Sequence, residues 1–348
     1  MKKIFAIFLI LALLSGCTPI APPASSPTGS SASLGDGLEV HFIDVGQADC
    51  ALLQCDDEYI LIDGGNVEDS SLVVSYLQQQ GVEELKAVIC SHAHEDHVGG
   101  LPGVLAVFPT AAVYAPTRTY ASKCFDEFVY YTDQQGLTVT IPKPGDVITF
   151  GGATATVLGP TKSYAETNDT SIILMVNYGS HRFLFTGDME VAAENDMLDY
   201  WGESFDWHAD VLKVGHHGSE TSTGYRFLRA VMPTYGIISV GNGNSYGHPH
   251  EQPLSRLQAA GVMLFRTDKL GHITVLSDGT NMHIQWGNQS ANPEGGEGVE
   301  ERFIGNKNSK TFHLPTCGNL PKKENQVEFE SYDDAIAAGY KPCGNCLK

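Results

Sequence analysis

The sequence predicts an α/β fold in which two β-sheets are packed between layers of helices, followed by a small C-terminal module. Short apolar segments typical of strands begin near Leu38, and strand-like and helix-like segments then alternate as far as Gln258. A second group of strands is expected around Gly271–Trp286. With 348 residues, of which 42% are hydrophobic and 18% charged, the chain can bury one large core and still spare residues for a tether and a module.

The N-terminal segment, residues 1–17, has the pattern of a bacterial lipoprotein signal. It starts with basic residues and continues with an apolar run, Ile4–Leu14, that is too short to span a bilayer comfortably. The run ends in Leu-Ser-Gly-Cys, which resembles the lipobox, so Cys17 is expected to be lipidated and to become the mature N-terminus. Simple secretion with an incidental cysteine is the alternative. Residues 18–37 are rich in Pro, Ser, Ala and Gly and are expected to form a flexible tether at the membrane.

The densest group of candidate metal ligands is the segment Ser91-His92-Ala93-His94-Glu95-Asp96-His97. It follows a buried strand pattern and precedes a helix expected to open near Val98. His92 and His94 can reach one ion from an extended segment, whereas Asp96 and His97 lie on the following turn and can serve a second ion. These ligands suit zinc, manganese or iron, and an ion with an open position can produce hydroxide near neutral pH. The pattern predicts two adjacent metal ions and hydrolytic chemistry.

Two later strand patterns end at further candidate ligands. The first ends at Thr186-Gly187-Asp188, where glycine permits a tight turn that presents Asp188, and one carboxylate there can bridge two ions. The second, Ala209–Val214, ends near the pair His216-His217. Because adjacent side chains point in different directions, only one histidine of this pair is expected to bind a metal, and a structural histidine is the alternative for the other.

The His-x-His-x-Asp-His pattern resembles the signature of the metallo-β-lactamase fold hydrolases, and the later motifs match that family in order. The segments Asn168–Ser171 and Tyr246–His250 narrow the resemblance to the branch that contains the extracellular domain of the ComEC competence protein and the phosphorylcholine esterases. The resemblance covers residues 38–286 and implies a four-layer αββα sandwich. It implies the following metal ligands: His92, His94, Asp96, His97, Asp169, Asp188 and His217.

The same resemblance implies that Asp96, His216 and His248 take part in catalysis. The family pattern favours His217 as the ligand and His216 as a partner that faces the substrate, although the order of the two stays open. His248 and His250 follow a strand, so at least one is expected to line the cleft, and a turn-capping role is the alternative.

One departure from the wider family concerns the metals. Many of these hydrolases have another histidine about twenty residues before the Gly-Asp turn, where this chain has Asn168 and Asp169. An oxygen ligand in place of an imidazole shifts the preference toward harder ions, so the two divalent metal ions can be zinc or manganese. Whether Asn168 or Asp169 faces them is left open.

The charge balance limits the substrate. The formal net charge is -20, with 21 Lys and Arg against 41 Asp and Glu, so no general basic field attracts long nucleic acid. A surface-anchored phosphodiesterase or nuclease is therefore expected to act on a smaller phosphoester, or on DNA that is held only at the cleavage point. The alternative is a nucleic-acid-binding surface protein whose hydrolase domain is catalytically idle and whose tail holds nucleic acid.

After residue 286 the apolar period is lost, and residues 287–301 are expected to be a linker. Residues 302–348 then carry four candidate ligands in two close pairs, which is the spacing that a tetrahedral structural zinc requires: His313, Cys317, Cys343 and Cys346. This stretch resembles the zinc-binding domain of the Ada DNA-repair protein, with His313 standing where that family has its first cysteine. A disulfide between Cys317 and one of the terminal pair is the alternative.

Overall fold

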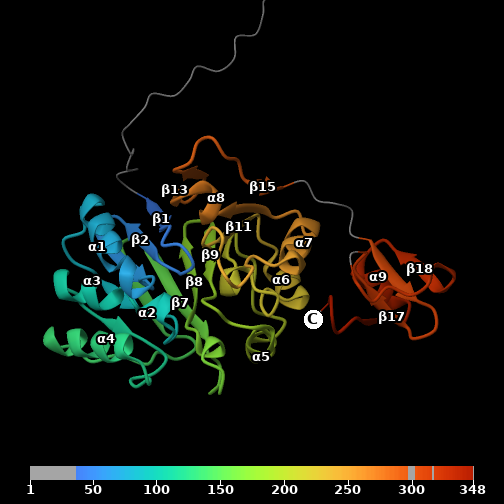
Figure 1. The fold of residues 1–348 in the computed structure, drawn as a ribbon, viewed down its shortest axis with the longest axis horizontal. Helices are drawn as coiled ribbons and strands as arrows, with labels where there is room; N and C mark the ends of the chain where they lie inside the picture. The colour runs from blue at the N-terminus through green and yellow to red at the C-terminus, as the bar shows by residue number, and fades with distance from the viewer. Residues whose placement is uncertain (1–36, 297–301, 316, 348) are drawn as a thin grey trace, which may run out of the picture. The chain divides into compact units, whose positions relative to one another are not determined.

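Two large β-sheets and one small sheet make up the strands of the computed structural model, which describes residues 37–296, 302–315 and 317–347 (Figure 1). The predicted signal segment, residues 1–17 with Cys17, lies outside the described residues, as does nearly all of the predicted tether.

The first large sheet has seven strands within the described residues. Their order is β14 (Met282–Trp286), β13 (Ile273–Ser277), β1 (Leu38–Phe42), β2 (Ala51–Cys55), β3 (Glu58–Ile62), β4 (Ala87–Ile89) and β5 (Val113–Tyr114). The strands from β14 to β3 are antiparallel, but β3, β4 and β5 run parallel. The carboxyl ends of β3 and β4 therefore lie side by side, and the histidine-rich segment begins directly after β4.

The second large sheet has eight strands in the described part of the chain. Their order is β15 (Glu294–Gly295), β12 (Met263–Arg266), β11 (Tyr235–Ile238), β10 (Val211–Lys213), β9 (His181–Phe185), β8 (Ile173–Tyr178), β7 (Ala153–Gly159) and β6 (Val147–Phe150). The strands β9 to β12 are parallel, so the loops after β9, β10 and β11 share one edge.

The strand β15 lies inside the segment that the sequence predicts to be only a linker. It pairs antiparallel with β12 through Met263 and Gly295 and through Leu264 and Glu294. The large domain therefore extends beyond Trp286. A two-residue edge strand leaves no periodic apolar pattern in the sequence, which is why the pattern alone reads as a linker.

Alternating side chains divide the large domain into four layers. On β1, Leu38, Val40 and Phe42 point into a core between the two sheets. On β2 and β3, Leu52 and Leu61 point the opposite way, into a second core against helices. That core packs the first sheet against α1 (Ser70–Gln79), α3 (Leu101–Val107) and α4 (Lys123–Gln134).

A third core packs the outer face of the second sheet against α5 (Val191–Trp201), α6 (Tyr225–Val231) and α7 (Glu251–Ala259). Short helices α2 (Glu95–Val98) and α8 (Thr267–Leu270) lie at strand ends. The layers are therefore helix, sheet, sheet and helix (Figure 1), and the predicted αββα sandwich is confirmed.

Two glycines bring the histidine-rich segment onto the loop after β3. A Cβ atom at Gly100 would lie 2.1 Å from the carbonyl oxygen of Gly64, and one at Gly99 would lie 2.4 Å from the backbone nitrogen of Val67. Any larger residue would push α2 and α3 off this loop. The close approach allows Gly64 to donate its backbone N–H to the carbonyl of His97 at 2.7 Å.

The C-terminal module is a small sheet with one helix. The strand order is β18 (Gln326–Phe329), β16 (Phe303–Asn306), β17 (Thr311–His313) and β19 (Lys341–Pro342), and α9 (Tyr332–Ala337) follows β18 in the chain. Phe303 and Phe312 are fully buried in its core. So small a core is typical of modules that depend on an additional staple.

Candidate metal centre

The histidine-rich segment changes from extended chain to helix in its middle. The helix α2 begins at Glu95, three residues earlier than the expected start at Val98, and His94 is its extended N-cap residue, with φ −70° and ψ 151°. His92 and His94 therefore come from extended chain, whereas Asp96 and His97 lie in the first turn of α2. This change of direction lets one short segment supply ligands to two neighbouring positions.

Four side chains from both sheets form the tighter of these positions. One ligand atom from each of Asp96, His97, Asp188 and His217 lies within 4.8 Å of all the others. The Oδ2 atom of Asp188 lies 3.4 Å from Nε2 of His97 and 3.6 Å from Nε2 of His217. Both imidazoles and Asp188 are buried.

Several atoms of this group have no hydrogen-bond partner among the described residues: Nε2 of His97, Nε2 of His217 and Oδ1 of Asp188. Buried polar atoms without partners are costly, and native proteins rarely leave them so. Two imidazole nitrogens with two carboxylates form a donor set that suits a divalent transition-metal ion. The residues therefore fit such an ion.

A second, looser position lies on the other side of Asp188. Nε2 of His92 is 4.0 Å from Oδ2 of Asp188 and 3.1 Å from Nδ1 of His94. Asn168 lines the same cleft, and its buried Oδ1 has no hydrogen-bond partner among the described residues. Asp169 instead accepts a hydrogen bond from the backbone N–H of Glu190 at 3.0 Å. The structure thus brings Asn168 to the cleft and leaves Asp169, expected as a ligand, outside both groups.

The two neighbouring histidines both reach Asp188, which the sequence does not predict. His216 and His217 each have left-handed backbone, with φ 49° and 52°. This conformation is uncommon for non-glycine residues, and such strained backbone clusters at functional sites. It turns Nε2 of His216 to 3.7 Å from Oδ2 of Asp188, close to the distance of 3.6 Å found for His217.

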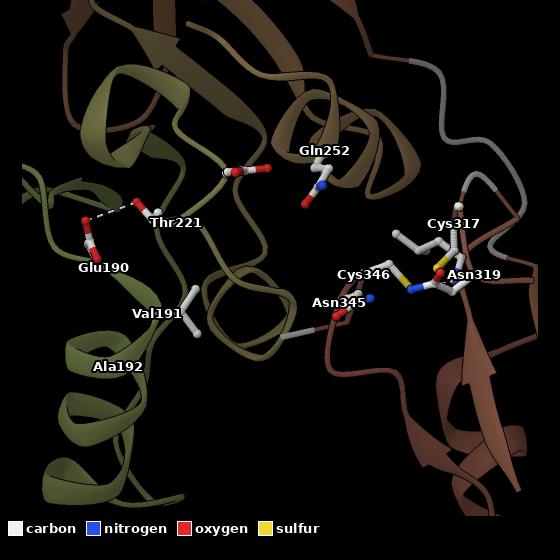
Figure 2. A pocket seen from close by; sticks show the side chains of 12 residues that line it. Glu190, Val191, Ala192, Thr221, Gln252, Cys317, Asn319, Asn345 and Cys346 are labelled. Carbon is white, nitrogen blue, oxygen red and sulfur yellow. Dashed lines mark hydrogen bonds between the residues drawn. The ribbon is translucent and has the colours of Figure 1, made fainter. Parts of the chain in front are cut away.

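The other nitrogen of His216 faces a small polar network. Nδ1 lies 3.2 Å from Oγ1 of Thr221 and 3.5 Å from Oε1 of Glu190. Thr221 also donates from Oγ1 to Oε1 of Glu190 at 3.1 Å, the bond drawn as a dashed line in Figure 2. These contacts orient His216, whose side chain is one-fifth exposed, toward the cleft.

Two further residues contact the buried imidazoles at Nδ1, the ring nitrogen that faces away from the metal position. Nδ1 of His97 lies 2.8 Å from Oδ2 of Asp63, and Nδ1 of His217 lies 2.9 Å from the carbonyl oxygen of Ser239. Such contacts fix which imidazole nitrogen faces the metal position. Asp63 and Ser239 are not predicted as site residues. In the sequence, Asp63 follows an apolar pair and precedes two glycines, a pattern that by itself indicates only a strand and a turn.

The carboxylates and imidazoles shift one another's proton affinities. Burial lowers the pKa of His217, but the carboxylates of Asp188 and Asp49 outweigh burial and raise it to about 10. Burial raises the pKa of Asp188, yet His97 and His217 hold it well below its ordinary value. Burial, and then the neighbouring His216, lower the pKa of His248 to about 4, so this imidazole is neutral at pH 7.

Both metal positions open into a cleft of about 360 Å³. It is lined by Gln47, His94, Glu95, Asp96, Asn168, Asp188, His216, His217, Tyr246 and His248. The His248 ring lies 5.5 Å from the ring of His216, and its Nδ1 is 3.3 Å from Nε2 of Gln47. His250 instead accepts the backbone N–H of Glu220 at 3.0 Å. Of the two histidines, His248 lines the cleft and His250 caps a turn.

The C-terminal module brings its four predicted ligands together. One ligand atom from each of His313, Cys317, Cys343 and Cys346 lies within 4.8 Å of the others, and Figure 2 shows two of the thiols, Cys317 and Cys346. All cysteines within the described ranges are free thiols, so the alternative disulfide is not present. Backbone N–H groups point at two sulfurs, Leu314 to Cys346 at 3.4 Å and Asn345 to Cys343 at 3.5 Å. The arrangement fits a tetrahedral zinc ion.

The sequence matches three known protein families. Residues 299–348 match the metal-binding domain of Ada, and residues 1–18 match the prokaryotic membrane lipoprotein lipid attachment site. Among the described residues, no helix is long and apolar enough to cross a membrane. The third match is the metallo-beta-lactamase superfamily, over residues 43–241.

The chain is also similar to several curated proteins. The chain is 32% identical to ComE operon protein 3 of Bacillus subtilis, over 68% of this chain and 32% of that protein. It is 29% identical to competence protein ComA of Neisseria gonorrhoeae, over 66% of this chain and 30% of that protein. It is 30% identical to recombination protein 2 of Haemophilus influenzae, over 68% of this chain and 28% of that protein. The chain thus spans about a third of the length of these relatives. By its fold, its ligand motifs and these matches, the chain belongs to the metallo-β-lactamase superfamily.

Proposed function

We propose that the large domain is a metal-dependent phosphodiesterase that acts on nucleotide-type phosphodiesters, with DNA among its substrates. One observation carries the proposal: Asp188 lies between two sets of imidazoles at an open cleft, and in the tighter set the Nε2 atoms of His97 and His217 lack hydrogen-bond partners among the described residues. In this arrangement Asp188 would bridge two divalent ions, with His92 and His94 on one side and Asp96, His97 and His217 on the other.

Two ions bound there would supply a nucleophilic hydroxide and would neutralise the charge that develops on the phosphoryl oxygens. The protein groups that face the substrate are His216 and His248. Because burial lowers the pKa of both, they are neutral imidazoles at pH 7 and can donate a hydrogen bond to a phosphoryl oxygen or to the leaving group.

The charges beside the cleft favour short substrates. A neighbouring hollow of about 650 Å³ shares residues with the cleft and is lined by five carboxylates: Asp44, Glu68, Asp69, Glu95 and Asp96. A long polyanion laid across the hollow would meet these charges, whereas a single phosphodiester at a chain end would not. The relatives named as a competence protein and a recombination protein support DNA as one source of such ends.

Loss of a ligand should abolish hydrolysis and spare the fold. We expect His94→Ala and Asp188→Asn each to lower kcat/KM for bis-nitrophenyl phosphate and short DNA by more than about 100-fold, because each removes a metal ligand from an accessible site. His283→Ala, at an exposed position on β14, is the control. Turnover at the wild-type rate in either variant contradicts the dinuclear mechanism, and hydrolysis of only a β-lactam or a phosphorylcholine ester contradicts the proposed substrate class.

Metal binding should release protons at neutral pH. With a pKa of about 10 in the metal-free protein, His217 holds a proton at pH 7 that an ion must displace. The apparent affinity for zinc or manganese should therefore rise with pH up to about pH 10. The metal-free protein should lose stability as the pH rises from about 6.5, the pKa of histidine in the unfolded chain, to about 10, its value for His217 in the folded chain. A raised histidine pKa stabilises the fold fully below the unfolded value, and this stabilisation is lost as the pH passes the folded value.

Calorimetric titration with zinc in buffers of different ionisation enthalpy measures this proton release. A heat of binding that is independent of the buffer at pH 7 contradicts the expectation. Thermal unfolding of the metal-free protein at pH 6, 8 and 10 tests the stability change separately.

We propose further that lipidated Cys17 anchors the protein on the outer face of a cell membrane. The match to the lipid attachment site supports this assignment. In cells that process lipoproteins, Cys17→Ala should move the protein from the membrane fraction to the soluble fraction, because an acyl anchor supplies the membrane affinity. Ser25→Ala, in the predicted tether, is the control. Unchanged partition of the Cys17 variant contradicts the anchor.

We also propose that the C-terminal cluster holds one structural zinc ion. Cys343→Ser in the full chain should lower the bound zinc by about one equivalent and loosen the module, while hydrolysis by the large domain remains, because zinc binding and folding are coupled in modules this small. Ser309→Ala, at an exposed site in the same module, is the control. A module that keeps its fold on chelation but loses it under reductant contradicts the zinc assignment. Metal analysis and protease sensitivity of residues 302–348 are the measurements.

A further inference from the structure

A buried ion pair lies directly behind the tighter metal position. Nζ of Lys213 is 2.7 Å from Oδ2 of Asp49 and donates to the carbonyl oxygen of Val214 at 3.0 Å. Lys213 is 4% exposed and Asp49 is 5% exposed. Neither residue can reach the substrate from this place, and Lys213 is the last residue of β10, four positions before His217.

Asp49 contacts three of the four ligands of that position. Its Oδ1 lies 3.3 Å from Nδ1 of His217, its Oδ2 lies 4.0 Å from Nδ1 of His97, and its backbone N–H donates to the carbonyl of Asp96 at 3.0 Å. The carboxylate therefore faces the rear nitrogens of both buried imidazoles, whose Nε2 atoms face the metal position.

The same region has the composition of a cation site. The ligand atoms of Asp49, Asp63 and His97 lie within 4.8 Å of one another, a third group among the described residues that could hold an ion. The ammonium of Lys213 already contacts Asp49, so it supplies a fixed positive charge there. Oδ1 of Asp49 and Oγ of Ser239 have no hydrogen-bond partner among the described residues, and both residues line a cavity of about 10 Å³, the size of one water molecule.

We infer that Lys213 and Asp49 form a positioning pair for the metal centre. The Lys213 side chain holds the Asp49 carboxylate behind His217 and His97, and Asp49 in turn orients their Nε2 atoms toward Asp96 and Asp188. The pair thereby sets the metal affinity of the tighter position. Lysine suits this task because it brings charge without competing with the catalytic ions for ligands. This inference rests on the metal centre of the proposed function, but not on its substrate.

A merely structural ion pair predicts a different result. Breaking a buried pair by removing one partner destabilises a protein, whereas removing both charges is often close to neutral. If the pair served only stability, removal of both charges would restore both the stability and the metal affinity. If Asp49 orients the ligands, removal of both charges restores the stability but leaves the metal affinity low.

The test compares four variants of the protein: Asp49→Asn, Lys213→Met, the double variant of both, and Arg266→Met as a control. Arg266 of β12 pairs with Asp268 of α8 at 2.7 Å in a mostly buried site, and neither residue belongs to the metal-ligand group. For each variant, zinc and cobalt dissociation constants are measured by competition with a chelator, together with the visible spectrum of the cobalt form and the Tm of the metal-free protein.

We expect Asp49→Asn to weaken one of the two metal sites by about 10- to 100-fold and to change the cobalt spectrum, as is typical for residues that orient ligands. Lys213→Met should show the same defect and a lower Tm, and the double variant should regain Tm but not affinity. Arg266→Met should lower only Tm. Wild-type affinity in Asp49→Asn, or full recovery of affinity in the double variant, overturns the inference.

Two further outcomes are decided by the same measurements. If Lys213→Met does not fold, Asp49→Asn and the double variant still give both readouts. Because no readout uses hydrolysis, an absence of phosphodiesterase activity would overturn the proposed function and would leave the result on the positioning pair intact.

Discussion

The carboxylate of Asp188, buried among imidazoles, is the contact on which the architecture of the site depends. Its Oδ2 atom lies within 4.0 Å of His92, His97, His216 and His217. His92 and His97 follow β4 of the first sheet, and His216 and His217 follow β10 of the second sheet. One carboxylate oxygen therefore contacts the histidines of both sheets. A buried carboxylate is tolerated only with compensating charge. In the metal-free protein His97 and His217 supply that charge, because neighbouring carboxylates raise their pKa values, and divalent ions would supply it in the metal-bound protein.

Packing of the two sheets against each other fixes the relative positions of the strand ends that carry these histidines. Phe42 of β1 stacks on Phe185 of β9 with ring centroids 5.7 Å apart, across the interface of the sheets and close to the strand ends that carry the ligands. Residues behind each sheet add rigidity, since Gly100 lets α3 approach the loop after β3 and Asp63 holds His97 from that loop. The precision of the site therefore comes from core packing and from close backbone contact, not from the ligands alone.

Sequence patterns predict the features that are local, and the fold predicted from them is confirmed. The four layers follow from strand periodicity, and the dense His92–His97 segment indicates candidate ligands because few other roles require such a composition. Features that depend on distant contacts escape prediction. Asp49 and Lys213 are 164 positions apart in the sequence and are brought together only by the packing of the two sheets. Neither residue is among the candidate ligands or catalytic residues that the sequence predicts.

Backbone conformation accounts for two further differences between the sequence-based expectations and the structure of the site. Adjacent side chains usually diverge, so the sequence assigns one histidine of the His216-His217 pair to the metals, but the left-handed backbone at both positions turns both toward Asp188. The choice between Asn168 and Asp169 likewise depends on a single 3₁₀ turn, η2 (Asn168–Thr170), which directs Asp169 to the backbone of Glu190. Residue type alone favours the carboxylate, and local geometry brings the amide to the cleft instead.

The acidity of the chain and its metal chemistry are linked. With a net charge of -20, the protein as a whole repels phosphoesters, and the carboxylates beside the cleft increase that repulsion. The same negative field concentrates divalent cations. Bound ions would then be the main local positive charge in the cleft, because the buried Lys213 is neutralised by Asp49. Substrate binding and substrate hydrolysis would therefore both depend on the metals, so that a metal-free form fails at the first step as well as at the chemical one.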